Sequence, residues 1–355
     1  MLNLLYFIIV LSILIFVHEF GHFLVARLSG VRVITFSLGF GKKLLSFKKG
    51  ETEYAVSAIP LGGYVKMLGE STEDVVTEAE ASRSYANKPP LIRILIAFSG
   101  PFFNILLALV VFFSIFLTGY PVPSTRTEIG QVMTGEPASD AGLKPGDVVT
   151  RINGREVHQW TELQKIVSGS DLRPLKFEID RQGKRIAVWI APKLRDEKNV
   201  FGETVGKMKL IGVAPASETR RESFTGATSK AFVDTYNLTE LTIVGIVKLV
   251  KGSISAKNVG GPILIFQQAG ERAKAGKSSF LFFLALISIN LGIVNLLPIP
   301  ILDGGHIFFS FIEMIVRRKI PVKAVEVAQK VGVGILVCIM VLATFNDIMR
   351  LFHVR

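Results

Sequence analysis

Cysteine is nearly absent from this sequence, and charge is scarce. The 355 residues include a single cysteine, Cys338, which excludes a disulfide within the chain. Charged residues make up 20% of the chain, whereas 49% are apolar and the mean hydropathy is +0.45. Long stretches carry almost no charge at all. This composition is typical of an integral membrane protein with water-exposed inserts.

No basic helix or aromatic platform accompanies the net charge of +12. Nucleic-acid binding is therefore not expected. Basic loops that set the topology of a membrane protein and contact anionic lipid headgroups account for the excess of lysine and arginine.

Four apolar stretches are long enough to cross a bilayer, and they predict transmembrane segments at 1–28, 91–120, 279–305 and 331–352. A cleaved signal peptide is the alternative for the first of them. It would begin with basic residues and end at small ones, and this stretch does neither. We therefore expect a retained helix.

The connections at 29–90 and 306–330 both contain clusters of lysine and arginine. Four spans place these two connections on the same side, and short basic connections stay cytoplasmic. Both termini and the long insert at 121–278 are then expected on the outer face, because long domains cross the membrane largely regardless of charge.

The insert begins with a compact domain, which we place at 121–217. Turn glycines separate short β-type runs in its first half, and two alternating strands flank the turn Gln182-Gly183 in its second half. Residues 218–278 contain apolar positions near helical spacing, interrupted by charges. We interpret them as an amphipathic helix on the membrane surface, over 222–250, followed by a linker.

The first apolar segment contains His18-Glu19-Phe20-Gly21-His22. Histidines four residues apart lie on one helical face, so both imidazoles can bind one metal ion, and the glutamate between them can reach a water on that ion. Ionisable groups are costly at membrane depth, which argues that these three have a function. A polar helix–helix contact without a metal is the alternative.

Asp303 is the predicted third metal ligand, with a fourth position left for water. Pro298 and Pro300 prevent a regular helix just before it, and irregular backbone at membrane depth is tolerated where it faces a cavity or a site. Asp303 can also serve as an N-cap where a helix restarts at Gly304, and the two roles are compatible.

Three asparagines lie in the apolar segments: Asn104, Asn290 and Asn295. Hydrogen bonding between helices is one explanation for them. The other is that Asn290 and Asn295 hold the substrate backbone or polarise its carbonyl group. Of the remaining histidines, His306 is interpreted as a helix residue at the membrane edge, with a supporting role near Asp303 as the alternative. We expect His158 and His353 at the surface.

Taken together, these residues resemble the site-2 protease family of intramembrane zinc metalloproteases, and within it the bacterial regulator-of-sigma-E protease branch. The resemblance extends over nearly the whole chain. It depends on these motifs: HEFGH at 18–22, IPLGGYVKMLGE at 59–70, GPFFN at 100–104, GLKPGD at 142–147, GGPI at 260–263 and SINLGIVNLLPIPILDGGH at 288–306.

The resemblance implies Zn²⁺ bound by His18, His22 and Asp303, with Glu19 as general base and Asn290 and Asn295 contacting the substrate. It also implies that 32–68 forms a β-rich, partly re-entrant sheet, in which Gly62 and Gly63 permit close approach of an unwound substrate. A plain turn at the two glycines is the alternative.

The domain at 121–217 resembles a single PDZ fold, where some relatives have two in tandem. A peptide terminus is expected to dock at its first strand, near Ile129 and Gly130. The other role open to one such domain is that of a steric filter, which excludes substrates with bulky outer parts.

The expected fold is thus an α-helical polytopic membrane protein with four transmembrane helices, a cytoplasmic-side β-rich re-entrant loop and one inserted PDZ-like α+β domain. By resemblance it lies in the bacterial inner membrane, in contact with lipids. Its expected substrates are single-span membrane proteins already shortened by an earlier cut, such as anti-sigma factors, cleaved within a stress response.

Two other classes of protein remain open. One is an inactive scaffold that binds peptide tails through the PDZ-like domain, although such a scaffold has no need of Glu19. The other is a metal transporter with a midplane site, although transporters usually show repeated halves and this chain shows none.

Overall fold

The computed structural model describes residues 2–70 and 76–353, which form two compact units. We call Met1–Leu117 with Ser223–Arg355 the membrane unit, and Thr118–Glu222 the inserted unit. Residues 71–75 of the predicted loop, and the side chain of His353, lie outside the described part of the chain.

Within the described residues, four helices of the membrane unit are long and apolar enough to cross a membrane. These candidate spans are α1 (Leu2–Leu28), α2 (Pro90–Thr118), α7 (Lys277–Asn295) and most of α9 (Val322–His353). The expectation of a polytopic helical protein is confirmed at this level. The fourth span begins at Val322, nine residues before the predicted boundary, because the helix continues through Lys323, Glu326 and Lys330 beyond the end of its apolar run.

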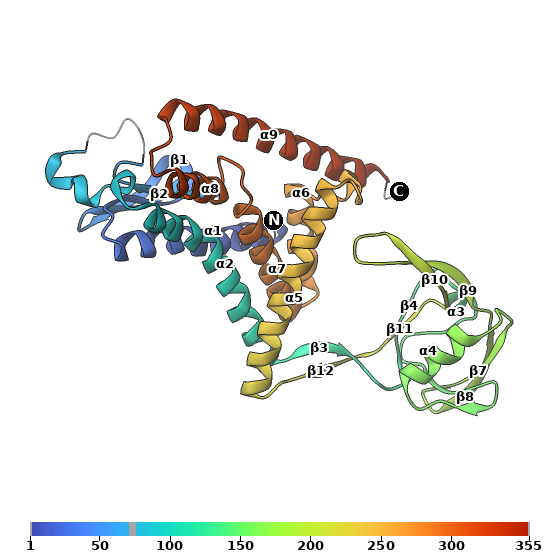
Figure 1. Cartoon of the computed structure of the whole chain (residues 1–355). Helices are drawn as coiled ribbons and strands as arrows, with labels where there is room; N and C mark the ends of the chain where they lie inside the picture. Colours follow the sequence, from blue (N-terminus) through green and yellow to red (C-terminus); the bar gives the residue numbers. More distant parts are fainter. Residues whose placement is uncertain (1, 71–75, 354–355) are drawn as a thin grey trace. The chain divides into compact units, whose positions relative to one another are not determined.

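Helices α1 and α2 cross in close contact, and small residues permit this (Figure 1). A Cβ atom on Gly21 of α1 would lie 2.5 Å from the carbonyl oxygen of Ser99 on α2. Gly292 allows α7 the same approach, since its Cβ would lie 2.9 Å from the carbonyl oxygen of Pro101. Small residues are common where membrane helices pack closely.

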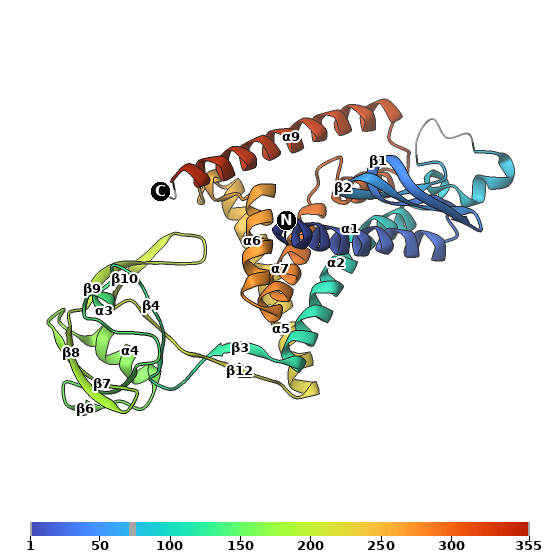
Figure 2. The ribbon, with the colours of Figure 1, turned by 180° about the vertical axis from the view of Figure 1, so that it is seen from behind.

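Residues 33–67 form a bent hairpin of two strands, β1 (Val33–Lys49) and β2 (Thr52–Met67). Each strand bends and so contributes two stretches, which lie side by side in the order 43–49, 52–57, 33–38 and 63–67. The bend in β1 includes Gly39, whose φ of +93° favours glycine. Phe23 and Ala26 of α1 pack with Val33, Phe36 and Val65 of the sheet, which fixes the sheet against α1 (Figure 2).

The chain leaves helical structure after α7 and restarts in α8 (Asp303–Val316). The break spans Pro298 and Pro300, as the sequence predicts. It is tightly packed: a Cβ atom on Gly304 would lie 2.2 Å from the carbonyl oxygen of Leu297. Asp303 therefore begins α8 beside the end of α7. At the far end of α8, Glu313 forms a largely buried ion pair with Arg93 of α2.

Two further helices complete the membrane unit, α5 (Phe224–Val250) and α6 (Pro262–Lys274). Ser223 caps α5 by accepting a hydrogen bond from the Gly226 N–H. Helix α5 packs along α7, and α6 packs against both α1 and α7. The location of residues 222–250 on the membrane surface stays a prediction.

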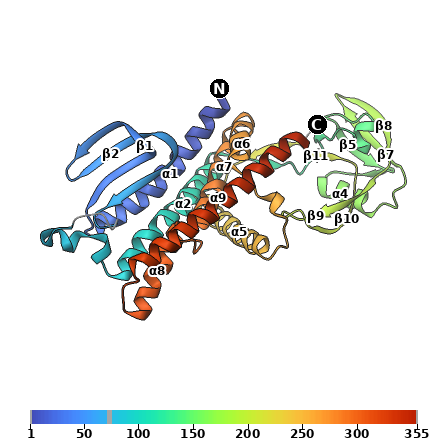
Figure 3. The same ribbon diagram turned by 90° about the horizontal axis from the view of Figure 1, so that it is seen from above.

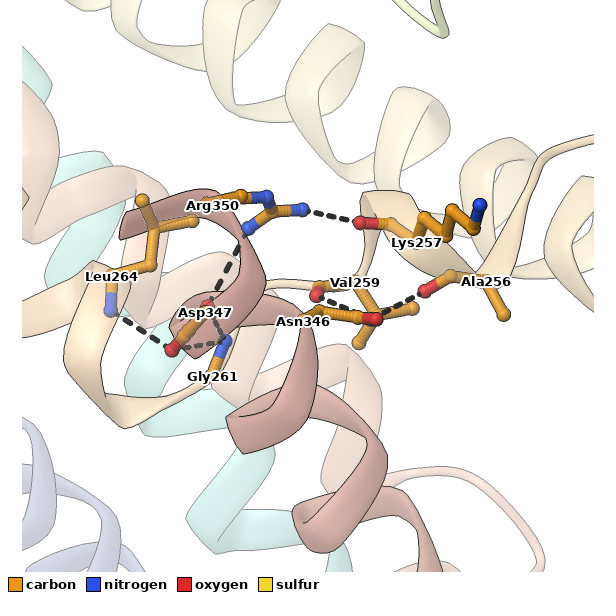
Figure 4. A network of polar contacts seen from close by, with 8 residues as sticks. All are labelled: Ala256, Lys257, Val259, Gly261, Leu264, Asn346, Asp347 and Arg350. Carbon is orange, nitrogen blue, oxygen red and sulfur yellow. Dashed lines mark hydrogen bonds and ion pairs between the residues drawn. The ribbon is translucent and has the colours of Figure 1, made fainter. Parts of the chain in front are cut away.

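Hydrogen bonds join the last turns of α9 to the start of α6 and to the residues just before it (Figures 3 and 4). The buried carboxylate of Asp347 accepts hydrogen bonds from the N–H groups of Gly261 and Leu264, and so caps α6 from another helix. Asn346 and Arg350 donate to carbonyl groups of residues 256–259. Buried polar groups of the fourth span are thereby satisfied within the protein.

The inserted unit is PDZ-like, with helix α4 (Trp160–Gly169) packed beside a four-stranded sheet of order β6-β5-β7-β8. Residues such as Ile129, Phe177 and Ile179 form its own buried core. The turn at Gln182 and Gly183 has positive φ at both residues, as expected for a tight hairpin between β7 and β8. The bounds of its strands and short helix, in chain order, are as follows: β3 (Tyr120–Pro123), β4 (Ile129–Val132), α3 (Pro137–Asp140), β5 (Val148–Ile152), β6 (Arg155–Glu156), β7 (Leu175–Arg181), β8 (Lys184–Ile190), β9 (Lys193–Lys198), β10 (Thr204–Leu210), β11 (Val213–Pro215) and β12 (Ser217–Arg220).

A buried carboxylate in this unit predicts a pH dependence of stability. Burial alone would raise the pKa of Asp147, but hydrogen bonds from the Arg181 guanidinium and the Lys144 N–H outweigh it, so the pKa lies below its ordinary value. The stabilising effect is complete above the unfolded pKa of about 3.9 and is lost as pH falls through the folded pKa. Asp147→Asn in the excised segment 118–222 should lower the unfolding free energy at pH 7 by about 1–3 kcal/mol.

Denaturant unfolding at pH 7 and pH 3 measures both effects. The difference between wild type and variant should shrink at pH 3. Glu156→Gln is the control, because Glu156 pairs with Arg151 at an exposed position and should contribute little. Equal pH dependence in wild type and Asp147→Asn would contradict the prediction.

Candidate metal centre

Two helices bring the predicted ligand set together. His18 and His22 lie one turn apart on α1, and Asp303 is the first residue of α8; both histidines are buried. The two Nε2 atoms are 3.2 Å apart, and the carboxylate oxygens of Asp303 lie 3.1 Å from His18 Nε2 and 3.3 Å from His22 Nε2. One ligand atom from each residue lies within 4.8 Å of the others. The structure thus juxtaposes residues 285 positions apart (303 minus 18) in the sequence.

The spacing of these donor atoms fits a tetrahedral zinc ion. Two donors bound at about 2.0–2.1 Å in a tetrahedron are separated by about 3.3 Å. The two Nε2 atoms are 3.2 Å apart, and they lie 3.1 and 3.3 Å from different oxygens of Asp303, so a donor pair at each contact has the required spacing. The donor set of two imidazoles and one carboxylate also suits zinc and leaves a fourth position open.

The tautomer of His22 supports the same assignment. Its Nδ1 lies 2.8 Å from the carbonyl oxygen of Ile96, which can only accept, so Nδ1 carries the proton. In a neutral ring the Nε2 atom then presents a lone pair toward Asp303. A hydrogen bond from the far nitrogen to a carbonyl group is the usual support of a metal-binding histidine.

Gly100 of α2 supplies the space for the two imidazoles. A Cβ atom at Gly100 would lie 2.2 Å from His22 Nε2 and 2.8 Å from His18 Cε1. No side chain fits there without displacing the rings. Glycine at this position is therefore part of the metal centre, although it supplies no ligand.

Glu19 lies in the same cavity as the three candidate ligands. The cavity has a volume of about 200 Å³, and its wall includes His306, Tyr85 and Glu70 as well as Gly63, Tyr64 and Val65 of β2. A Cβ atom on Gly63 would lie 2.9 Å from Glu19 Cγ, so this glycine lets the strand approach the carboxyl-bearing side chain. The stretch 63–67 pairs only with β1 among the described residues, which makes it an edge of the sheet.

The two predicted substrate-contacting asparagines have different surroundings. Asn295 Nδ2 lies 3.4 Å from His18 Nε2, next to the candidate ligands. Asn290 instead accepts a hydrogen bond from Thr242 of α5, at 2.8 Å. Gly62 packs against the ring of Phe40, away from Glu19. Substrate contact by any of these residues stays a prediction.

The predicted peptide-docking strand of the inserted unit is already paired. Ile129 is buried, donates to the carbonyl of Asp147 and accepts from the N–H of Gly146. β11 lies along the other side of β4, and a Cβ atom on Gly130 would lie 2.5 Å from the carbonyl oxygen of Pro215. Peptide binding at this strand stays a prediction. His158 is exposed at the surface of the same unit.

Sequence reasoning gave Gly100 no role and Asn104 only a general one, hydrogen bonding between helices. Gly100 faces His22, and Asn104 Nδ2 lies 3.2 Å from His18 Nδ1. The two residues are four apart in the motif GPFFN, the spacing that also separates the two histidines. The sequence signal was therefore the same four-residue spacing on two consecutive apolar helices, which could have suggested that GPFFN faces the two histidines.

Comparison with known proteins gives consistent relatives. The family model of peptidase family M50 matches residues 6–339. A protein of Campylobacter jejuni named as a proposed zinc metalloprotease is 41% identical over 346 residues, covering 97% of this chain and 92% of that protein. Zinc metalloprotease RasP of Geobacillus kaustophilus is 32% identical and covers 98% of this chain and 97% of that protein. Among solved structures, the PDZ domain of the SdrC-like protein of Listeria monocytogenes is 19% identical, with a TM-score of 0.20, over 26% of this chain and 88% of that one.

Apolar helices long enough to span a membrane, three side chains that could hold a metal ion and the family match together identify a multi-pass membrane zinc metalloprotease. The chain belongs to peptidase family M50, the site-2 protease family. The resemblance inferred from HEFGH and LDGGH, including that to the regulator-of-sigma-E branch, is confirmed, as is zinc as the cofactor.

The space at Gly100 generates a prediction. Gly100→Ala places a methyl group where the two imidazoles lie, so at least one ring must shift. Displacement of catalytic geometry by about 1 Å can cost about 100-fold in rate. We expect a loss of about that size in cleavage of a single-span test substrate, together with weaker zinc retention during dialysis.

Gly334→Ala is the matched control, because a Cβ atom on Gly334 of α9 meets no atom within 4 Å. This variant should retain wild-type zinc content and rate. Full activity in Gly100→Ala would mean that the rings do not occupy the observed positions in the working enzyme.

Proposed function

We propose that this enzyme hydrolyses peptide bonds within transmembrane segments of single-span membrane proteins, with His18, His22 and Asp303 as zinc ligands and Glu19 as general base. The observation that carries the proposal is the convergence of the three donor atoms within 4.8 Å, in one cavity with Glu19 and on an apolar helix that can span a membrane.

Zinc held by His18, His22 and Asp303 would lower the pKa of a water molecule and polarise the carbonyl group of the substrate. Glu19 accepts the proton of the attacking water and delivers it to the leaving amine. His22 keeps its orientation through the hydrogen bond to the Ile96 carbonyl. The Asn295 amide lies beside His18, where its N–H can donate to a substrate carbonyl whose oxygen gains negative charge.

A transmembrane helix shields its own peptide bonds, so the substrate must unwind locally before attack. The sheet edge at 63–67 lines the cavity that contains Glu19. An exposed edge can pair with an extended peptide, which satisfies the backbone groups that unwinding leaves without partners. We infer that the unwound substrate lies along this edge, and Gly63 permits its close approach to Glu19.

The substrates we propose are single-span proteins already shortened on their outer side, such as anti-sigma factors. The basic connections support a location of the active site toward the cytoplasm and of the inserted unit outside. A folded PDZ-like unit of about one hundred residues on the outer face then acts as a steric filter against substrates with bulky outer domains.

Two substitutions separate metal binding from catalysis. Glu19→Gln should retain zinc but reduce cleavage of a single-span test substrate by at least about 100-fold, because a general base contributes about 10²–10⁴-fold. Asp303→Ala should lose both zinc and cleavage, since two ligands remain of three. Metal analysis and a gel-based cleavage assay on the purified proteins measure both quantities.

Glu240→Gln serves as the control, because Glu240 is an exposed glutamate on α5. A wild-type rate in Glu19→Gln would refute the general-base assignment. If His18→Ala left function intact while deletion of 118–222 removed it, a peptide-binding scaffold would replace the protease. Zinc flux into liposomes without cleavage would instead indicate a transporter.

The proposed sidedness predicts a labelling pattern. In a Cys338→Ser background the chain has no other cysteine, so single cysteines can be introduced at the exposed positions Lys48 of β1 and Lys165 of α4. A membrane-impermeant thiol reagent added to intact spheroplasts should label Lys165→Cys, and should label Lys48→Cys after permeabilisation only. The reverse pattern would invert the proposed topology.

A further inference from the structure

Asn104 is a fully buried amide on α2, next to the metal centre, that the proposed mechanism does not use. It is 0% exposed, and its Nδ2 atom lies 3.2 Å from His18 Nδ1. Its Oδ1 atom is buried without a hydrogen-bond partner among the described residues. A buried amide oxygen without a partner is costly, so this arrangement requires an explanation.

Zinc binding at His18 Nε2 sets a condition on the other ring nitrogen. A neutral imidazole has one N–H, and Nε2 can bind a metal only if that proton is on Nδ1. The group facing Nδ1 must then accept a hydrogen bond. The NH₂ group of Asn104 cannot do so, whereas its Oδ1 can.

Rotation of the Asn104 amide by 180° gives a partner to both Asn104 Oδ1 and His18 Nδ1–H, and it moves the NH₂ group to the position that Oδ1 occupies in the structure. The nitrogen and oxygen of an amide occupy nearly equivalent positions, so the flip needs no change in the backbone. After it, Oδ1 accepts from the Nδ1–H of His18, and the oxygen that lacks a partner gains one. The distance of 3.2 Å between the amide and His18 Nδ1 suits either orientation.

We propose that Asn104 is a positioning residue for His18, and that its amide oxygen holds the ring in the tautomer whose Nε2 lone pair is available to zinc. The inference rests on the proposed role of His18 as a ligand. It also gives α2 a defined task at the metal centre: α2 supplies one acceptor for each histidine, the Ile96 carbonyl for His22 and the Asn104 amide for His18.

The backbone of Asn104, but not its side-chain amide, also forms a hydrogen bond with a third helix. Ser288 of α7 donates a hydrogen bond to the Asn104 backbone carbonyl, at 2.6 Å. Asn295, on the same helix, approaches His18 from the Nε2 side. His18 is therefore bounded by amide groups at both ring nitrogens, and only the one at Nδ1 can set the tautomer without competing for the metal.

Zinc affinity, measured by competition with a chelator, tests the inference independently of activity. Asn104→Leu has no hydrogen-bonding group and similar size, and should bind zinc about 10–100-fold more weakly, the usual effect of removing such a partner. Asn104→Asp keeps only acceptor atoms and should bind zinc within about threefold of wild type, or more tightly. Substitution with Co²⁺ adds a spectroscopic readout, because the visible absorption of wild type and Asn104→Asp should agree while that of Asn104→Leu should change.

Ser288→Ala is the matched control for disturbance of the helix contact, and it should keep zinc affinity within about threefold. If Asn104→Leu does not yield monodisperse protein, Asn104→Ala replaces it with the same expected loss. Three outcomes would each overturn the inference. The first is unchanged zinc affinity in Asn104→Leu, and the second is equal weakening in Asn104→Asp and Asn104→Leu. The third is weakening in Ser288→Ala as large as in Asn104→Leu. His18→Ala separates failure of the proposed ligand set from failure of the role of Asn104. If His18→Ala retains zinc, the ligand set is refuted. If His18→Ala loses zinc while Asn104→Leu retains it fully, only the role of Asn104 is refuted.

Discussion

The structure depends on bringing two imidazole nitrogens and both oxygens of one carboxylate together inside an apolar helical bundle, with each nitrogen close to a different oxygen. Two imidazole nitrogens and a carboxylate at 3.1–3.3 Å do not attract one another unless a cation or protons are shared between them. Desolvation at membrane depth adds to this cost. The surrounding fold must offset this cost, and α1 and α2 approach each other closely beside the site, at Gly21 and Gly100. A divalent cation held there would also offset it, which would couple metal binding to folding.

The carboxylate reaches this site only because α7 ends before it. A continuous helix from Lys277 would carry residue 303 about 40 Å along its axis, at about 1.5 Å per residue, and could not return it to α1. The break at Pro298 and Pro300 ends the span, and Gly304 and Gly305 pack against the carbonyl groups of the preceding turn. Asp303 is thereby fixed at the start of a new helix, close to His18 and His22. The prolines and glycines near Asp303 thus matter for its position and not for its chemistry.

Much of the metal centre could be predicted from the sequence, because its signals are local. The histidines four apart, the apolar spans and the proline break each follow from helix geometry or from backbone chemistry within one segment.

Contacts between segments could not be predicted in this way. Nothing in residues 222–250 indicates that Thr242 donates to Asn290, and nothing in the fourth span indicates that Asp347 caps α6. The order of the four stretches in the β1–β2 sheet depends equally on long-range pairing. The start of α9 differs from the prediction for another reason: its first turns mix apolar residues with Lys323, Glu326 and Lys330, so hydropathy alone does not mark where the helix begins.

The sheet lies directly against the helix that bears two of the candidate ligands, and this bears on how a membrane-embedded protease avoids indiscriminate hydrolysis. Glu19 is enclosed between the candidate ligands and the strand at Gly63, in a cavity of about 200 Å³. In the proposed mechanism an extended stretch of substrate enters this cavity, because an intact helix, about 10–12 Å in diameter with its side chains, shields its own peptide bonds. If the substrate lies along the 63–67 edge as proposed, its susceptibility to cleavage reflects how readily the segment unwinds there. Helix-weakening residues such as glycine and proline in a substrate then act through that equilibrium.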